Sequence, residues 1–413
     1  MAASLALNTR ANLLPAGFLA LGTFAIGTEG FMIAPLLPVM ARDFAMPVPR
    51  VALLVVVFTL VLALSSPVAT VATGRMARKR VLLLAMSLFA IGNAAAALSS
   101  SFAVLLGARV LMAVAAGLYV PAANGLAGVI VAPGMRGRAL AIVSAGQTLA
   151  IALGLPLGGV IGHAFGWRAT FGLVGAMSAI AIVGIAAGIA REAGQGVVVA
   201  SLRERVSVTR QRAVQRLLAV SLFWAIGAFA VYPYIAEYLA AVLDFDPNAV
   251  TATVSLWGLA AAAGVMTGGV FNDRFGAERV VRASLVLLAL SFLALAAASG
   301  LPARIAFVPV LVAVALWGFT VWSFFPAQMS RLIGAGAPGQ ATVALALNTS
   351  TMYFGFSIGS ALGALVLGTG ALWGIGVVAA LAEAIALGLN ARLGTWPQAA
   401  KSLHRNATTG LDG

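Results

Sequence analysis

Four ionisable side chains fall inside apolar segments that are long enough to cross a membrane: Glu29, Arg109, Glu237 and Glu383. A charge in the bilayer interior is costly, so each of these residues is a candidate for function. Glu29 lies nine residues before the expected end of the first segment at Pro38. Arg109 lies seven residues after the expected start of the fourth segment at Phe102. At 1.5 Å per residue, both lie roughly 10–14 Å from the same membrane boundary, so the two side chains can pair.

Glu29 and Arg109 have the chemistry of a proton-coupling pair. Burial favours the protonated form of a carboxyl group, and a neighbouring guanidinium favours the ionised form. An arginine that moves would therefore switch Glu29 between holding and releasing a proton, with proton and cargo competing for the carboxylate. The alternative is a static ion pair that only fixes packing. Arg109 has no charged counterpart in the second half of the chain, which favours the coupling role.

Each of the other two acidic residues has more than one interpretation. Glu237 lies six residues before the expected end of the seventh segment, where it either faces a cavity mouth or extends toward the outer surface beside Asp244 and Asp246. Glu383 lies within the last segment, where a structural or lipid-adjusting role is favoured if that helix is peripheral.

Further polar and aromatic residues inside the segments are candidates for lining a substrate path, because cargo cavities are mostly apolar with a few placed polar groups. The alternative for each one is packing or anchoring at the membrane interface. The candidate substrate-binding residues, with Glu237, are Tyr119, Asn124, Gln147, Trp224, Tyr232, Tyr234, Trp257, Trp322, Gln328, Asn348 and Tyr353.

The sequence offers no catalytic or cofactor motif. It has no cysteine, and its two histidines, His163 and His404, are too far apart in sequence for ligand spacing. The glycine-rich run 146–162 lacks the strand–loop–helix context and the lysine of a phosphate-binding loop. We therefore expect no enzyme activity, no cofactor and no metal.

The composition identifies the elements that hold these residues. Hydrophobic residues make up 62% of the 413-residue chain, charged residues 9%, and the mean hydropathy is +1.05. A soluble domain has about 25% charged residues, far more than this chain. An outer-membrane barrel shows alternating segments of about ten residues, and these are absent here. The pattern predicts an all-α membrane protein with twelve spans of about 20 or more residues. They are expected near 14–38, 48–73, 81–99, 102–130, 139–162, 168–190, 217–243, 249–272, 280–299, 304–328, 341–367 and 371–391.

The distribution of basic residues predicts the orientation. Of the 25 Lys and Arg residues, 20 lie on the side of the chain termini, four on the other side, and Arg109 within a span. Both termini are therefore expected to be cytoplasmic, in a bacterial inner membrane. The net charge of +14 follows from this topology and needs no nucleic-acid partner. The basic segment 191–216 predicts an amphipathic helix on the anionic inner leaflet, because Leu202, Val206, Ala213 and Leu217 have near-helical spacing.

The chain repeats itself with an offset of 205 residues. The Ala-Pro-Gly at 132–134 recurs at 337–339, and the G-x-x-x-G of Gly154 and Gly158 recurs as Gly359 and Gly363. Paired six-span repeats have their substrate site at the interface of the halves. We expect an N-terminal bundle at 1–190, a cytoplasmic linker at 191–216, a C-terminal bundle at 217–392 and a cytoplasmic tail at 393–413. The small residues of 146–162 predict a close-packed seam at the junction of the bundles.

These motifs resemble those of the major facilitator superfamily, in its twelve-span drug:proton antiporter and sugar-efflux branch. GLPLGG at 154–159 is similar to the antiporter motif of the fifth span. GVFNDRFGAER at 269–279 resembles the loop motif G-x-x-x-D-R-x-G-R-K, although Ala277 and Glu278 replace its basic pair. Arg109 falls on the motif arginine of the fourth span, and FAIGTEGFMIAPLLP at 24–38 is similar to the acidic first span of the branch.

The resemblance implies roles for these positions. It implies proton transfer at Arg109, protonation or cation recognition at Glu29, and a charge latch between span ends at the loop motif. It also implies a monomer. The residues expected to control conformation are Gly146, Gly154, Pro156, Gly158, Gly159, Gly269, Asp273, Arg274, Gly359 and Gly363.

The sequence therefore predicts a proton-coupled secondary transporter that exports lipophilic or cationic drug-like compounds, or sugars, by alternating access. Its expected partners are a small-molecule substrate, protons and the lipid bilayer. The alternative is a uniporter or a proton symporter for a small polar metabolite such as a sugar, amino acid or nucleoside.

Overall fold

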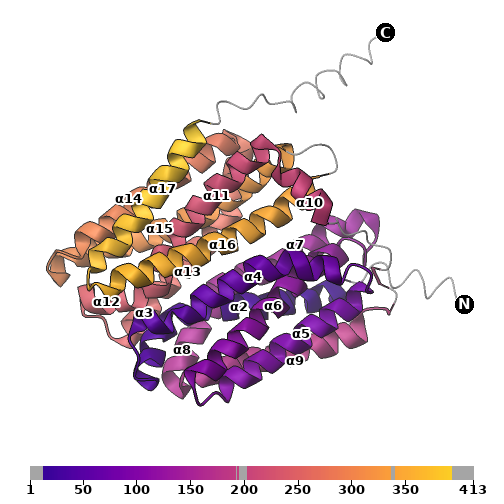
Figure 1. Ribbon diagram of the computed structural model, residues 1–413, viewed down its shortest axis with the longest axis horizontal. Coiled ribbons are helices and arrows are strands. Elements are labelled where there is room, and N and C mark those ends of the chain that lie inside the picture. Colours follow the sequence, from indigo (N-terminus) through magenta and orange to yellow (C-terminus); the bar gives the residue numbers. More distant parts are fainter. Residues whose placement is uncertain (1–12, 192, 195–201, 336–339, 393–413) are drawn as a thin grey trace, which may run out of the picture.

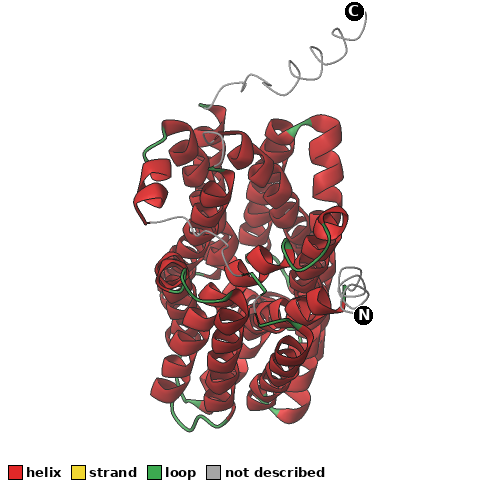
Figure 2. Ribbon diagram, turned by 90° about the vertical axis from the view of Figure 1, so that its right-hand side faces the viewer, coloured by secondary structure: helices red, strands yellow, loops and turns green. Residues whose placement is uncertain are grey.

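A computed structural model describes residues 13–191, 193–194, 202–335 and 340–392. This described part is built from helices joined by short loops, and it contains no strand (Figure 2). The expected tail at 393–413 and the second Ala-Pro-Gly at 337–339 lie outside the described residues.

Twelve helical spans in the described residues are long and apolar enough to cross a membrane, as the sequence predicts. Several spans are built from more than one element. The elements are α2 (Leu14–Asp43), α3 (Val48–Val51), α4 (Leu53–Ala72), α5 (Arg78–Ala97), α6 (Phe102–Ala127), η1 (Pro133–Met135), α7 (Arg136–Leu149), η2 (Ala150–Gly154), α8 (Leu155–Phe165), α9 (Trp167–Gly188), α10 (Leu202–Thr209), α11 (Arg212–Val231), η3 (Tyr232–Tyr234), α12 (Ile235–Leu243), α13 (Pro247–Phe275), α14 (Ala277–Ala298), α15 (Ala303–Ala335), α16 (Ala341–Gly368) and α17 (Leu372–Ala391).

Three boundaries differ from the expectation by five residues or more. The first span ends at Asp43 and not near 38. The seventh span begins at Arg212 and not near 217, because α11 extends through residues that the sequence places in the linker. The predicted linker helix is therefore two elements, α10 and the start of α11, with a break at 210–211. The tenth span ends at Ala335 and not near 328.

The helices form two groups that lie side by side (Figure 1). In the first group α2 packs against α7 and α9, and α6 packs against α4 and α5. In the second group α11 packs against α16 and α17, and α15 packs against α13 and α14. The groups meet where α4 contacts α16, where η2 and α8 contact α13, and where α12 contacts α2. We call the side that holds the start of α2 and the end of α17 the terminal side, and the side that holds α3 and α12 the opposite side.

The glycine-rich seam mostly joins helices of the same half, which corrects the expectation from the sequence. A Cβ added at Gly154 would overlap Thr28 of α2, and one added at Gly158 would overlap Met32. Gly359 likewise lies against the backbone of α11 in the second half. Only Gly159 among these glycines faces the other half, where an added Cβ would lie 2.9 Å from Thr251 Cγ2.

One residue type is required at the turn between α13 and α14. Gly276 has φ 84° and ψ 145°, a conformation that side-chain-bearing residues rarely adopt. This glycine belongs to the loop motif, so the backbone conformation explains why the motif has glycine at this position.

Candidate functional site

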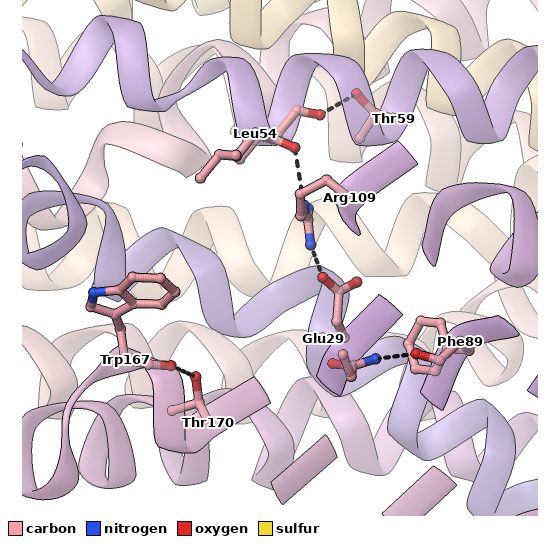
Figure 3. Close-up of polar contacts among 9 residues, drawn as sticks. Glu29, Leu54, Thr59, Phe89, Arg109, Trp167 and Thr170 are labelled. Atoms are coloured by element: carbon pink, nitrogen blue, oxygen red, sulfur yellow. Dashed lines mark hydrogen bonds and ion pairs between the residues drawn. The ribbon is translucent and has the colours of Figure 1, made fainter. Parts of the chain in front are cut away.

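Glu29 of α2 and Arg109 of α6 form an ion pair inside the first half. Arg109 Nη1 contacts Glu29 Oε1, and neither side chain is exposed. Arg109 Nε donates a hydrogen bond to the Leu54 carbonyl oxygen at 3.1 Å. Figure 3 shows Arg109 between Leu54 and Glu29, with its guanidinium pointing at the carboxylate. The Arg109 Cζ also lies 4.0 Å from the centroid of the Phe58 ring. Three different groups therefore compensate the guanidinium charge.

Neighbouring elements place these groups. Ser101 caps α6 by accepting a hydrogen bond from the Val104 amide, and Arg109 follows two turns later. Leu54 is the second residue of α4, and Phe58 comes one turn after it. Because α4 packs against α6, the carbonyl and the ring reach the same guanidinium.

Glu29 can change its charge state while Arg109 keeps other interaction partners. An ionised pair is neutral overall, which lowers the cost of burial. If Glu29 takes up a proton, Arg109 still has the Leu54 carbonyl and the Phe58 ring as partners. Glu29 Oε2 has no hydrogen-bond partner among the described residues, so one lone-pair site of the carboxylate is unused.

An aromatic cluster lies where the two halves meet. We define it as Phe31, Tyr232, Trp257, Trp317 and Trp322, which come from α2, η3, α13 and α15. Tyr232 Oη donates to the Phe31 carbonyl oxygen at 2.8 Å, and its ring centroid lies 4.8 Å from that of Trp257. The Phe31 centroid lies 6.0 Å from that of Trp322. The structure thus brings together three predicted substrate-binding residues, Tyr232, Trp257 and Trp322.

Four other predicted binding residues are buried within one half. Tyr119 Oη donates to the Leu19 carbonyl at 3.2 Å. Tyr234 Oη donates to the Ser360 carbonyl. Gln328 Nε2 donates to the Leu217 carbonyl at 2.8 Å. Trp224 stacks on Phe324 with ring centroids 4.7 Å apart. Contacts within one half therefore explain why the four side chains are buried.

The remaining candidates are distributed over α6, α7, α12 and α16. Asn124 is exposed, whereas Gln147, Glu237 and Tyr353 are half-buried. Asn348 is buried, and its Nδ2 lies 3.1 Å from Met352 Sδ. A substrate-binding role for these residues stays a prediction.

In the loop motif, Asp273 and Arg274 form no ion pair within the described residues, whereas Glu278 pairs with Arg282 of α14 at 3.1 Å. Asp273 and Arg274 are exposed, and Asp273 accepts a hydrogen bond only from Asn272 Nδ2, at 3.3 Å. In the first half, Lys79 Nζ donates to the Ala186 carbonyl at 2.7 Å, at the end of α9. This contact between a basic residue of α5 and a helix terminus lies in the first half, and the charge latch that the resemblance implies at 269–279 stays a prediction.

The surroundings of Glu383 bear on the role expected from the sequence. Its side chain is fully buried against α11, which fits a structural role better than a lipid-adjusting one. The sequence shows that this carboxyl lies in a span, but an apolar helix gives little indication of which face is buried.

Sequence reasoning missed several residues of the site. Phe31 could have been found, because it lies two residues after Glu29 in the same span. Leu54 and Phe58 carry no signal in the sequence, since their role depends on how α4 is rotated against α6. Among the described residues, no group of three His, Asp or Glu could hold a metal ion.

Known transporters resemble this chain over most of its length. The family model of the Major Facilitator Superfamily matches residues 19–341. The chain is 29% identical over 369 residues to an uncharacterized MFS-type transporter of Bacillus subtilis, covering 89% of this chain and 93% of the relative. It is 26% identical to a probable sugar efflux transporter of Mannheimia succiniciproducens, covering 89% and 91%. It is 28% identical to a chloramphenicol resistance protein of Streptomyces lividans, covering 90% and 95%.

Solved structures share the fold. A bacterial homologue of the human lysosomal transporter Spinster, in an inward-facing and unoccupied conformation, superimposes with a TM-score of 0.75. It covers 95% of this chain and 99% of its own at 17% sequence identity. At this identity the likeness concerns the fold alone.

Proposed function

The chain belongs to the major facilitator superfamily and is a membrane transporter, not an enzyme; on this premise we propose that it is a proton-coupled exporter working by alternating access. The observation that carries the proposal is the buried pair of Glu29 and Arg109. A transporter that uses the proton gradient needs a group that binds a proton in the membrane interior and whose affinity can change. Glu29 meets this need, because its affinity for a proton depends on the position of Arg109.

Two relatives support a direction and a class of cargo. They are named for sugar efflux and for chloramphenicol resistance, which supports export of a small molecule. The aromatic cluster at the junction favours lipophilic cargo, because aromatic side chains give most of their binding energy through apolar contact. With termini in the cytoplasm of a bacterial cell, export runs from the terminal side to the opposite side.

Alternating access is the proposed mechanism. Hydrogen bonds join the halves on the opposite side at three points: Tyr232 with Phe31, Ser357 with the Val56 carbonyl, and Thr251 with His163. In the proposed cycle, cargo enters from the terminal side while these contacts hold. Proton uptake by Glu29 from the opposite side then follows cargo release.

The test uses the purified full chain in vesicles that contain a trapped pH-sensitive dye. A thermal-shift screen at two pH values first selects the probe from chloramphenicol, ethidium and a labelled disaccharide. An outward gradient of that probe should drive protons into the vesicles containing the wild-type protein. The Glu29→Gln and Arg109→Ala variants should abolish this acidification.

Arg168→Gln provides the matched control, because Arg168 pairs with Asp43 at 2.7 Å in a half-exposed position away from the candidate site. It should retain proton movement. Probe-driven proton movement that persists unchanged in both Glu29→Gln and Arg109→Ala would refute the proposal.

A further inference from the structure

Glu383 is a buried carboxyl group that the proposed mechanism does not use. Its side chain has no solvent exposure, and neither carboxyl oxygen has a hydrogen-bond partner among the described residues. It lies against Gly227 of α11, where an added Cβ would come within 2.5 Å of Glu383 Oε1. The glycine therefore leaves the space that the carboxyl group occupies.

The helices around Glu383 bring no cation into contact with it. α17 packs against α11, α14 and α16. The ionisable residues of α11 are Arg212 and Arg216, and Arg216 is eleven residues from Gly227, or about 16 Å along the axis. α16 contributes only Tyr353. α14 contributes Glu278, Arg279 and Arg282, all in its first six residues on the terminal side.

One cation, Arg331, contacts α17 further toward the terminal side. Arg331 of α15 donates to Asn390 Oδ1 at 2.7 Å. Asn390 lies seven residues beyond Glu383, which is about 10 Å along the helix. None of the ion pairs formed by the described residues includes Glu383.

An ionised carboxylate in such surroundings would be very unfavourable, and a buried carboxyl without a partner takes up a proton instead. We propose that Glu383 is a second proton-binding site, located in the second half, that holds a proton in this conformation and exchanges it with the terminal side. Glu29 and Glu383 thus differ in kind: the first is neutralised by an arginine and the second by a proton.

The position of Glu383 couples it to motion between the halves. The seventh span changes from α-helix to a 3₁₀ turn at η3, five residues after Gly227. Before this break α11 packs against α17, and after it α12 packs against α2 of the other half. Rocking of the halves would bend the span at the break and alter the wall around Glu383. The polar groups of Gln328, Arg331 and Asn390 lie on the terminal side of the site, where water would enter.

Infrared spectroscopy of the full chain in lipid vesicles tests the proposal without any substrate. At neutral pH the wild type should show the carbonyl-stretching band of a protonated carboxyl group, and transfer to D₂O should shift this band. The band should remain in Glu29→Gln and in the half-exposed control Glu278→Gln, and it should disappear in Glu383→Gln.

Three results would overturn the proposal: no such band in the wild type, a band unaffected by Glu383→Gln, or a band lost in Glu29→Gln instead. A band that never shifts in D₂O would overturn the exchange. If Glu383→Gln does not fold, Glu383→Asp serves as the second variant and should displace the band in frequency. Because the measurement concerns only protonation, its outcome is independent of whether the chain exports the chosen probe.

Discussion

At the scale of single residues, Arg109 shows how a charge is tolerated inside an apolar bundle. Its guanidinium has a carboxylate, a backbone carbonyl and an aromatic face as partners, and all three lie within the first half. Counting residues from the span ends places Glu29 and Arg109 at one depth, and the structure brings them into contact. The Leu54 carbonyl has no sequence signature, because any residue supplies the same group.

The pair predicts a specific pattern of stability. Removing one partner of a buried ion pair leaves an uncompensated charge and costs about 3–5 kcal/mol. Glu29→Gln should therefore lower the thermal unfolding midpoint of the purified protein clearly, whereas Glu29→Gln combined with Arg109→Met should recover most of the loss. Arg168→Gln removes a half-exposed pair and should cost less than about 1 kcal/mol. Equal midpoints for Glu29→Gln and Arg168→Gln would contradict a buried, energetically coupled pair.

At the scale of elements, close packing between helices depends on small residues at defined positions. All twelve spans are predictable, because twenty apolar residues have few alternatives to a membrane helix. The sequence does not predict which helix packs against which, since lipid and protein favour the same side chains on the surface of a helix. The sequence identifies Gly154 and Gly158 as packing residues but places them at the junction of the halves, whereas they contact α2 of their own half.

Substitution of Gly154 should measure this contact. Gly154→Ala places a methyl group against Thr28 Oγ1 and should destabilise the protein by about 1–3 kcal/mol, the usual cost of overpacking. Gly172 of α9 has no atom within 4 Å of an added Cβ, so Gly172→Ala should be neutral or stabilise by up to about 1 kcal/mol. Thermal unfolding of both variants under identical conditions decides the matter. A Gly154→Ala variant as stable as Gly172→Ala would show that α2 and η2 separate easily.

At the scale of the whole molecule, the contacts between halves set which side is closed. Tyr232, Ser357 and His163 make hydrogen bonds across the junction on the opposite side. The internal repeat predicts two similar bundles, and the structure has two groups of six spans. The repeat cannot predict which side is closed, because the same sequence adopts every state of a transport cycle.

Removing one of these contacts should shift the conformational equilibrium. Tyr232→Phe deletes the hydrogen bond to the Phe31 carbonyl, worth about 1 kcal/mol, so the population open on the opposite side should rise about fivefold. The chain has no cysteine, so spin labels can be attached to cysteines placed at the exposed positions 50 and 369 without other changes. The longer distances between these labels should gain population.

Tyr119→Phe is the matched control, because the Tyr119 hydroxyl bonds to Leu19 within one half. It should leave the distance distribution unchanged. Identical distributions for Tyr232→Phe and the wild type would mean that the tyrosine hydroxyl does not hold the halves together.

The π-helical turn of η2 has a consequence for the phase of the fifth span. Residues 146, 150, 154, 158 and 162 are spaced by four and all lie against α2. In a regular α-helix this spacing drifts by about 40° at each step, or about 160° over sixteen residues, which would carry one end off the partner. The π turn holds one residue more than an α turn, so it reduces the drift to about 60°. The π turn thus keeps these five residues on the side of the span that faces α2. It also leaves Gly159, the next residue after Gly158, directed at α13. Deleting one residue from 150–154 would restore a regular helix and rotate α8 by about 100°, so that neither contact could form.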